Sequence, residues 1–194
     1  ISGKDSMFND FKGYDAQGNP IKISVPPTLL ISSLGIIEDV ENAVTIDAKF
    51  SGDLIYILGE TFGELGGSEY FSQLGFVGNK VPETNPEKNL KIYKAYAKVV
   101  NAGLISSGIG ISRGGLAVAL AKTATAGGFG ADINLKDIPG KFVFDSEALF
   151  SESTGRILLT INPKNKIKFK GLTKGIKFAE IGKVTKEQKI IVTN

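Results

Sequence analysis

Hydrophobic and polar positions divide the chain into a short leading part and a longer part in which predicted strands and helices alternate. In the leading part, residues 21–25 alternate in polarity and predict a half-buried strand, 28–37 predict a more buried strand, and 43–48 a third short one. The pattern changes near Ser51, because residues 54–58 are continuously apolar, which is typical of a strand buried on both faces. We therefore place a domain boundary at about Ser51.

The clearest helix begins with Asn85 as its cap and Pro86 in its first turn, and it ends before Gly103. Its apolar stripe at helical spacing consists of Leu90, Tyr93, Ala97 and Val100, and Tyr96 widens it. Further helices are predicted at 116–126, at 145–150 with Asp145 or Ser146 as cap, and at 165–172. Further strands are predicted at 105–111, 131–135, 156–161, 176–184 and 189–193. This alternation favours an α/β sheet with helices packed on it, on one face in the simplest arrangement.

Composition narrows the chemistry that the chain can perform. The 194 residues include no cysteine and no histidine, which excludes disulfides, thiolate metal sites, cysteine nucleophiles and His-dependent hydrolases. A net charge of +3 is too small to indicate nucleic-acid binding. A late cluster of lysines predicts a solvated face, with a polyanion-binding patch as the alternative; it comprises Lys164, Lys166, Lys168, Lys170, Lys174 and Lys177. No signal peptide or membrane-spanning run is recognised, so we expect a cytoplasmic protein.

Three glycine-rich junctions are candidates for chemistry, and the first is at the very start. Residues 2–6, Ser-Gly-Lys-Asp-Ser, form a polar turn in which Gly3 allows a backbone N–H to approach a phosphate closely. The spacing differs from that of the nucleotide triphosphatase loop, so an ordinary turn is equally compatible. Such a loop needs a preceding strand, so we expect this chain to be a piece of a longer protein.

The second and third junctions each follow a predicted strand and precede a predicted helix. In the second, residues 59–70, backbone N–H groups at the helix start favour an anion, with Ser68 as a helix cap. Its carboxylates could bind Mg²⁺ or be simply solvated; they are Glu60, Glu64 and Glu69. In the third, residues 108–116, Ser112 could cap the helix, Arg113 could meet a phosphate or lie at the surface, and the glycines permit close approach of a ligand or of a packed strand.

Several stretches, in this order, resemble the C-terminal part of the phosphoribosylformylglycinamidine synthase family, within the aminoimidazole ribonucleotide synthetase-like superfamily. The matching stretches are 2–7, 27–30 with 35–39, 52–59, 64–70, 114–121, and 149–153 with 155–156. The most specific is Leu-Gly-Gly-Ser-Glu-Tyr at 65–70. The resemblance implies an α/β (α+β) fold: a PurM-like C-terminal domain with a mixed sheet and helices packed on it at 51–194. The tail of the second PurM-like, ATP-binding N-terminal domain would precede it at 1–50.

The resemblance also implies a reaction. This family uses ATP and Mg²⁺ to activate the formamide oxygen of formylglycinamide ribonucleotide (FGAR), and ammonia from a glutaminase partner then displaces phosphate to give the amidine. A small accessory subunit and a homodimer are further implied partners, with no role for nucleic acid or membrane. The family's catalytic His belongs to the first half of the large subunit, so we expect this fragment to be inactive alone.

Site residues are implied position by position. The opening loop matches a family motif, Gly-Asn-x-Ser, whose Gly contacts ATP, whose Asn contacts Mg²⁺ and whose Ser contacts substrate. Gly3 and Ser6 match, whereas Lys4 stands at the Asn position, where it could pair with phosphate but not ligate a metal. In the third junction the family often has His-Asp-x-Ser-Asp-Gly-Gly-Leu. Here Ser112 and Gly114 remain as expected nucleotide contacts, whereas the positions of the His and the two Asp carry Ile109, Gly110 and Arg113.

Three interpretations follow from these residues. The first is a fragment of the ATP-dependent amidine-forming ligase that adds phosphate and substrate contacts to a site completed elsewhere. The second is a non-catalytic scaffold that docks other subunits, which the loss of both carboxylates in the third junction favours. The third is another superfamily member, related to hydrogenase-maturation, selenophosphate or thiamine-phosphate kinase-like proteins, against which the 65–70 loop argues.

Overall fold

The computed structural model describes residues 10–24, 31–37 and 39–194, and it divides the chain into two compact units, 1–40 and 41–194. In the first unit, β1 (Phe11–Tyr14) and β2 (Pro20–Ile23) form an antiparallel hairpin. Its turn is fixed by the Asp15 carboxylate, which accepts hydrogen bonds from the backbone N–H groups of Gln17 and Asn19 at 2.9 and 2.8 Å. Within 31–37 the predicted strand is absent, and residues 28–30 lie outside the described residues.

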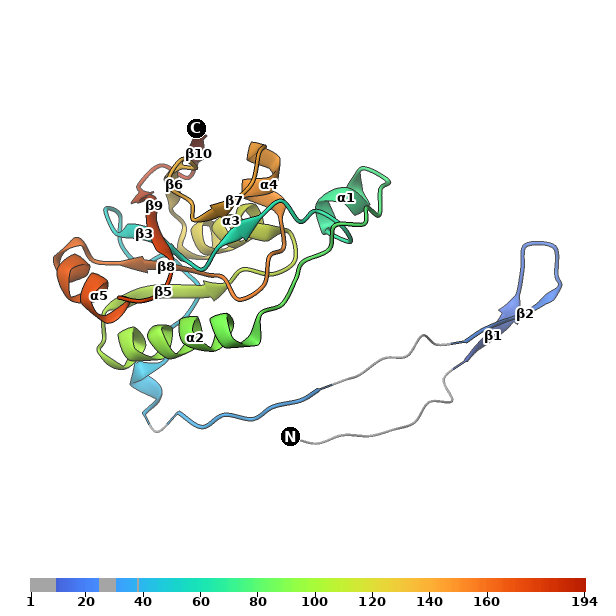
Figure 1. The fold of residues 1–194 in the computed structure, drawn as a ribbon, viewed down its shortest axis with the longest axis horizontal. Coiled ribbons are helices and arrows are strands. Elements are labelled where there is room, and N and C mark those ends of the chain that lie inside the picture. The colour runs from blue at the N-terminus through green and yellow to red at the C-terminus, as the bar shows by residue number, and fades with distance from the viewer. Residues whose placement is uncertain (1–9, 25–30, 38) are drawn as a thin grey trace. The chain divides into compact units, whose positions relative to one another are not determined.

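The second unit is built on a six-stranded sheet in the order β10-β6-β9-β3-β8-β5 (Figure 1). Its strands are β3 (Leu54–Leu58), β5 (Ile105–Gly110), β6 (Gly130–Asn134), β8 (Ile157–Ile161), β9 (Phe178–Thr185) and β10 (Ile190–Thr193). All neighbouring pairs are antiparallel except β10 with β6, so the sheet is mixed. The remaining elements are η1 (Val40–Asn42), β4 (Thr61–Phe62), α1 (Glu69–Gln73), α2 (Pro86–Asn101), α3 (Gly115–Gly127), β7 (Gly140–Lys141), α4 (Asp145–Phe150), η2 (Pro163–Asn165) and α5 (Lys166–Leu172).

Helices cover both faces of this sheet, so the expectation of cover on one face is wrong (Figure 1). The reason lies in β3, whose alternate side chains are all apolar: Ile55 and Ile57 pack with α3 and α4, whereas Tyr56 and Leu58 pack with α2 and α5. A strand that is apolar on both sides needs a hydrophobic layer on each.

The predicted bounds of α2 and its Asn85 cap are confirmed. The Asn85 side chain accepts a hydrogen bond from Lys88 N at 3.0 Å. Its buried stripe is Ile92, Ala95 and Val99, so the predicted stripe is wrong. Leu90 and Tyr93 are about half exposed, at 51% and 49%. Two apolar stripes share this helix, and hydrophobic periodicity alone did not show which of them faces the sheet.

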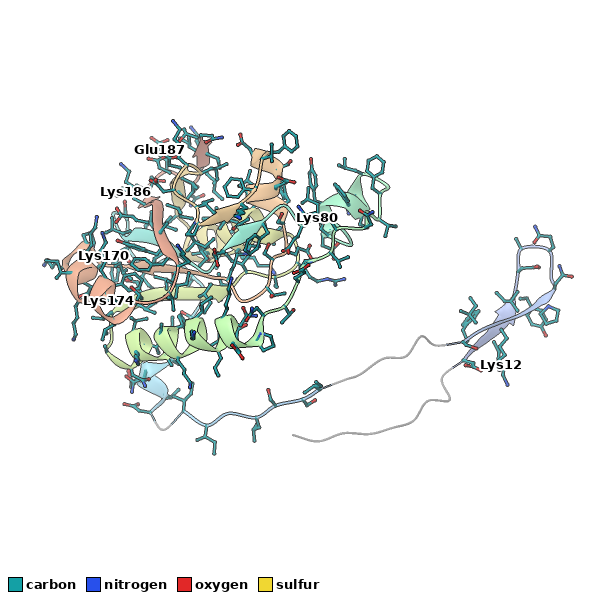
Figure 2. All side chains as sticks on the ribbon, viewed as in Figure 1. Lys12, Lys80, Lys170, Lys174, Lys186 and Glu187 are labelled. Carbon is teal, nitrogen blue, oxygen red and sulfur yellow. The ribbon has the colours of Figure 1, made fainter. Side chains whose placement is uncertain are left out.

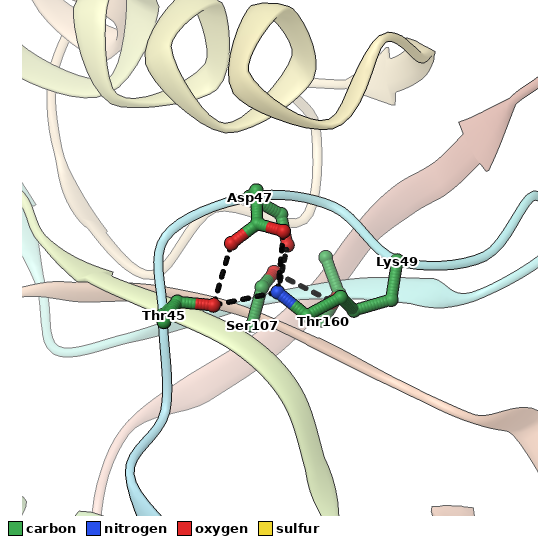
Figure 3. Close-up of polar contacts among 5 residues, drawn as sticks. All are labelled: Thr45, Asp47, Lys49, Ser107 and Thr160. Carbon is green, nitrogen blue, oxygen red and sulfur yellow. Dashed lines mark hydrogen bonds and ion pairs between the residues drawn. The ribbon is translucent and has the colours of Figure 1, made fainter.

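The segment before β3 is irregular, so the strand predicted at 43–48 is wrong, but its contacts anchor it to the edge of the sheet. Lys49 Nζ pairs with the Asp47 carboxylate at 2.5 Å and donates to Thr45 Oγ1 at 2.6 Å (Figure 3). The Thr45 carbonyl accepts from Gly108 N in β5 at 3.0 Å. Beside it in Figure 3, the buried hydroxyls of Ser107 and Thr160 join β5 to β8 at 2.7 Å. The hydrogen bond from Lys49, and to a smaller extent that from Thr45, lowers the pKa of Asp47 to about 2.

Asp53, the residue before β3, has only 1% of its surface exposed, and its Oδ2 atom has no hydrogen-bond partner among the described residues. Burial raises the pKa of Asp53, and a hydrogen bond from Ser106 offsets this only partly. Because the pKa of Asp53 is higher in the folded state, the protonated carboxyl contributes its full stabilisation at pH values below its usual pKa of 3.8. That stabilisation is lost as the pH rises through the folded value.

Asp53→Asn, which stays neutral, is therefore expected to be more stable than the wild type near neutral pH, by about 1 kcal/mol. This gain should disappear below pH 3.8, where Asp53 is protonated in both states. Urea unfolding at the two pH values measures the difference. Asp137→Asn, at an exposed position, is the control and should change stability by no more than about 0.5 kcal/mol. A gain for Asp53→Asn that is independent of pH would contradict the assignment.

Candidate functional site

The loops that carry the second and third glycine-rich junctions meet at one end of the sheet. The strands β3 and β5 both end there, at Leu58 and Gly110, and the antiparallel β8 begins there, opposite both residues, at Ile157. Three segments therefore lie at this end of the sheet: the 59–68 loop, the 111–114 loop and the 151–156 segment. None of these segments is adjacent to another in the sequence, and the sheet register brings them together.

The second junction forms a compact loop held by backbone contacts. The short strand β4 pairs in parallel with β7, and Gly66 N donates to the Lys80 carbonyl at 2.8 Å. Ser68 caps α1 as predicted, since its hydroxyl accepts from Phe71 N at 3.2 Å. A Cβ on Gly66 would lie 2.7 Å from the backbone of Lys80, so this position requires glycine.

The third junction starts α3 without a serine cap. The N-cap residue is Gly114, which has a left-handed backbone with φ of +79° and no side chain to offer. Ser112 is exposed, so the prediction that it caps this helix is wrong. The glycines do serve close packing: a Cβ on Gly115 would lie 2.6 Å from the Leu149 carbonyl oxygen. Arg113, 85% exposed, pairs with the Glu69 carboxylate at 3.0 Å.

The 151–156 segment contributes a buried cation to the site. Arg156 is 1% exposed, and its guanidinium donates to the Ser153 carbonyl and the Thr61 hydroxyl, each at 2.9 Å, and to the Ser151 carbonyl. Burial lowers the pKa of Arg156 to about 10, and the carboxylates of Glu64 and Glu152 oppose that shift. The guanidinium remains charged at neutral pH and ties the second junction to this segment.

Glu64 is the buried carboxylate of this network, with 7% exposure. Its Oε2 accepts from the Ser153 hydroxyl at 2.7 Å and its Oε1 from Glu83 N at 3.2 Å. Its own backbone N–H donates to the Ser151 hydroxyl at 3.2 Å. Glu64 therefore organises the loop, and its carboxylate oxygens already have donors.

Glu152 joins the two junctions directly. Its Oε1 accepts hydrogen bonds from Glu69 N at 2.9 Å and from Gly114 N at 2.8 Å. These donors are the first residue of α1 and the N-cap residue of α3. Neither Glu152 nor Arg156 is among the site residues predicted from the sequence. The available signal was an acidic residue between two serines and an arginine at the start of an apolar strand, which is unusual for a surface turn.

The structure does not gather the proposed magnesium carboxylates. Glu60 pairs with Lys88 at 3.5 Å and Glu69 with Arg113, while Glu64 is held by Ser153 and Glu83 N. In the part of the chain that the structure describes, no group of three or more acidic side chains lies together in a way that could hold a metal ion.

A cavity of about 540 Å³ opens on the α2 side of these loops. It is polar and mixed in charge, with Glu60, Glu64 and Glu83 on its wall beside Lys88, Lys91 and Lys177. The cavity is large enough for a small metabolite, and the buried Glu64–Ser153 pair forms part of its lining.

Of the lysine cluster, Lys177 lines this cavity, and the other five members do not. Apart from Lys166, which pairs with Glu180 at 2.7 Å, its members are exposed. Figure 2 shows Lys170 on α5 and Lys174 just after this helix, at the outer edge of the unit. This agrees with a solvated face. Within the described residues, no helix has both the length and the apolar character needed to cross a bilayer.

Of the predicted site residues, Gly3, Lys4 and Ser6 lie outside the described residues. Ser112 and Gly114 are described; Ser112 is exposed and Gly114 is buried with its N–H bonded to Glu152. The nucleotide contacts expected of these residues stay predictions.

The model of the family described as AIR synthase related protein, C-terminal domain, matches residues 51–193. The chain belongs to this family. Its curated relatives include the phosphoribosylformylglycinamidine synthase subunit PurL of Methanocaldococcus jannaschii, 38% identical over 87% of this chain and 23% of the relative. PurL of Caldanaerobacter subterraneus is 39% identical over 84% of this chain and 21% of the relative. The chain thus spans less than a quarter of the length of these relatives, and the resemblance seen in its motifs is confirmed.

Solved structures support the same fold for this AIR synthase related domain. Thermotoga maritima PurL complexed with FGAR has a TM-score of 0.70 at 22% identity, covering 79% of this chain and 27% of that one. The same protein complexed with ATP has a TM-score of 0.64 at 19% identity, covering 79% and 25%. The PurLQS structure from T. maritima has a TM-score of 0.67 at 20% identity, with the same coverage. The predicted PurM-like fold, a mixed sheet with helices packed on it, is confirmed.

Proposed function

We propose that this chain is the C-terminal portion of a phosphoribosylformylglycinamidine synthase large subunit. In this proposal it contributes substrate and phosphate contacts to an ATP-dependent ligase that converts FGAR and ammonia to the amidine. The observation that carries the proposal is the identity of 38% to a curated PurL subunit over 87% of this chain. Because the chain spans only 23% of that subunit, the fragment is proposed to be inactive alone.

The contacts follow the sequence motifs. Gly3 and Lys4 are proposed to approach the nucleotide phosphates, and Ser6 to hydrogen-bond the substrate. The T. maritima PurL structures complexed with FGAR and with ATP support a fold of this kind in which both ligands bind. Neutralising phosphates and placing ammonia in line is mostly positioning and electrostatics, which backbone N–H groups and Lys4 can supply.

The described residues fit the nucleotide only in part and do not fit a metal ion. Ser112 is exposed and able to meet a ligand, whereas a phosphate would reach Gly114 N only in place of Glu152. The carboxylates Glu60, Glu64 and Glu69 are held separately by other groups. We therefore assign Mg²⁺ to segments of the whole enzyme other than the described residues of this chain.

The proposed partners are the rest of the large subunit, a glutaminase subunit and a small accessory subunit, with a homodimer as a further assembly. The PurLQS structure from T. maritima supports an assembly that includes PurL. The assembled enzyme is proposed to work in the cytoplasm.

A scaffold role without catalysis is the alternative that a specific observation favours. Arg113 stands where the family often has Asp, and it pairs with Glu69 of the neighbouring junction. Together with the occupied Gly114 N–H, this indicates that the third junction holds the fold together. The curated PurL relatives argue against the third interpretation, a kinase-like or hydrogenase-maturation protein.

Ser6→Ala in the full-length enzyme tests the ligase proposal. Loss of one hydrogen bond to the substrate should lower kcat/KM for FGAR about tenfold, since each 1.4 kcal/mol is a factor of ten. Ser72→Ala, at an exposed position on α1, is the matched control and should leave turnover unchanged. Unchanged kinetics for Ser6→Ala would defeat the proposed role and favour the scaffold.

A further inference from the structure

The Glu152 carboxylate occupies the place where the sequence predicts a phosphate. Both glycine-rich junctions offer a backbone N–H at a helix start, which is the usual arrangement for binding an anion. In the structure these two N–H groups, of Glu69 and Gly114, converge on one oxygen of Glu152 at 2.9 and 2.8 Å. The anion at this position is therefore a side chain of the protein itself.

The helix α3 needs an acceptor from outside its own cap. The N-cap residue Gly114 has no side chain that could accept a hydrogen bond, and the Ser112 carbonyl accepts from Gly115 N at 2.9 Å. The N–H of Gly114 therefore needs an acceptor from another segment. Glu152, 38 residues further along the chain, supplies that acceptor and places a negative charge at the positive end of the helix. Loss of a capping acceptor destabilises the start of a helix, so this contact contributes to the stability of α3.

Neighbouring contacts hold the 149–152 segment against both helix starts. The ring of Phe150 stacks on Tyr70 of α1 with centroids 4.6 Å apart and planes 7° from parallel. The backbone of 149–151 lies so close to Gly115 that any Cβ there would overlap it. Arg156 also donates a hydrogen bond to the Ser151 carbonyl. The position of Glu152 is thus fixed by the contacts of residues 149–151 as well as by its own hydrogen bonds.

We propose that Glu152 is the resident anion of the two junctions: it positions the start of α1 against the start of α3, and it excludes phosphate groups from the space between them. A phosphate would have to displace a carboxylate that already accepts two hydrogen bonds, and the two negative charges would repel each other. The nucleotide and substrate phosphates are then left to other loops of the assembled protein. This role holds whichever reaction that protein performs.

Inorganic phosphate is the probe that tests the exclusion, with the backbone N–H signals of Glu69 and Gly114 in the ¹⁵N NMR spectrum as the readout. In the wild type these signals should not move on titration. In Glu152→Ala the vacated donors should bind phosphate, and both signals should shift together and saturate at millimolar concentration. In Glu152→Gln, whose side-chain oxygen can accept both hydrogen bonds, the signals should again stay still. Shifts of both signals in the wild type, or none in a folded Glu152→Ala, would overturn the proposal.

A second measurement covers the case in which Glu152→Ala is too unstable for spectroscopy. Phosphate should raise the melting temperature of Glu152→Ala by more than that of the wild type, because it replaces the missing anion in the folded state only. Glu187→Ala, which removes an exposed carboxylate far along the chain, corrects for the general stabilising effect of phosphate. An equal rise in all three proteins would refute the resident-anion role, and a rise confined to Glu152→Ala would support it.

Discussion

Arg156→Met is expected to destabilise the protein by about 3–5 kcal/mol, the range found when one partner of a buried charge network is removed. The guanidinium of Arg156 donates to two backbone carbonyls and the Thr61 hydroxyl, and it lies beside Glu64 and Glu152. Methionine fills a similar volume but donates no hydrogen bond. The carbonyls of Ser151 and Ser153 lose that donor, and Glu64 stays buried but loses the charge of Arg156.

Urea unfolding measures this loss, and Arg113→Met is the matched control. The Arg113 side chain is 85% exposed and its pair with Glu69 is at the surface, so the control should change stability by no more than about 0.5 kcal/mol. A loss for Arg156→Met below about 1 kcal/mol would mean that the network does not depend on its cation, and would argue that Glu64 is satisfied by Ser153 and Glu83 N alone.

Much of the second unit could be predicted from the sequence, because its elements have strong local signals. Residues 54–58 gave β3 with the observed bounds, and the Asn85-Pro86 pair gave the start of α2. Predictions failed where two patterns competed. The helix α2 carries two apolar stripes, and only the sheet determines which one is buried. The start of α4 lacks the predicted Asp145 or Ser146 cap, since Phe144 is the N-cap residue and Glu147 accepts from Val143 N at 2.7 Å.

The candidate site was predictable in its parts but not in its assembly. Glycine spacing indicated two junctions at strand ends, and Ser68 was correctly assigned as a cap. The acceptor shared by those junctions comes from a third segment, and no local rule links Glu152 to Glu69, which precedes it by 83 residues. Such contacts depend on the antiparallel pairing of β8 with β3 and β5, and hence on the complete sheet. Glycine-rich junctions at helix starts indicate a bound anion, but only the three-dimensional structure shows that the Glu152 carboxylate is that anion.

Gly115→Ala is expected to cost about 2–4 kcal/mol, because two penalties act at one position. Its backbone is left-handed with φ of +66°, a conformation that disfavours any side chain. In addition, the new Cβ would lie 2.6 Å from the Leu149 carbonyl oxygen and 2.7 Å from that of Ser151, both of them backbone atoms that cannot turn aside. The 149–151 segment must move, and Glu152 follows it directly in the chain.

Gly110→Ala provides the matched comparison, since it lies in the same junction with no heavy atom within 4 Å of its ideal Cβ and without a left-handed backbone. Its stability should stay within about 0.5 kcal/mol of the wild type. The stability difference between the two variants separates the general effect of adding a methyl group from the close approach that only Gly115 makes. If Gly115→Ala also frees Gly114 N from Glu152, its ¹⁵N signal should shift in that variant and not in Gly110→Ala. Similar stability for both variants would show that the 149–151 segment moves at little energetic cost. Glu152, which follows this segment, would then not be held rigidly enough to exclude phosphate.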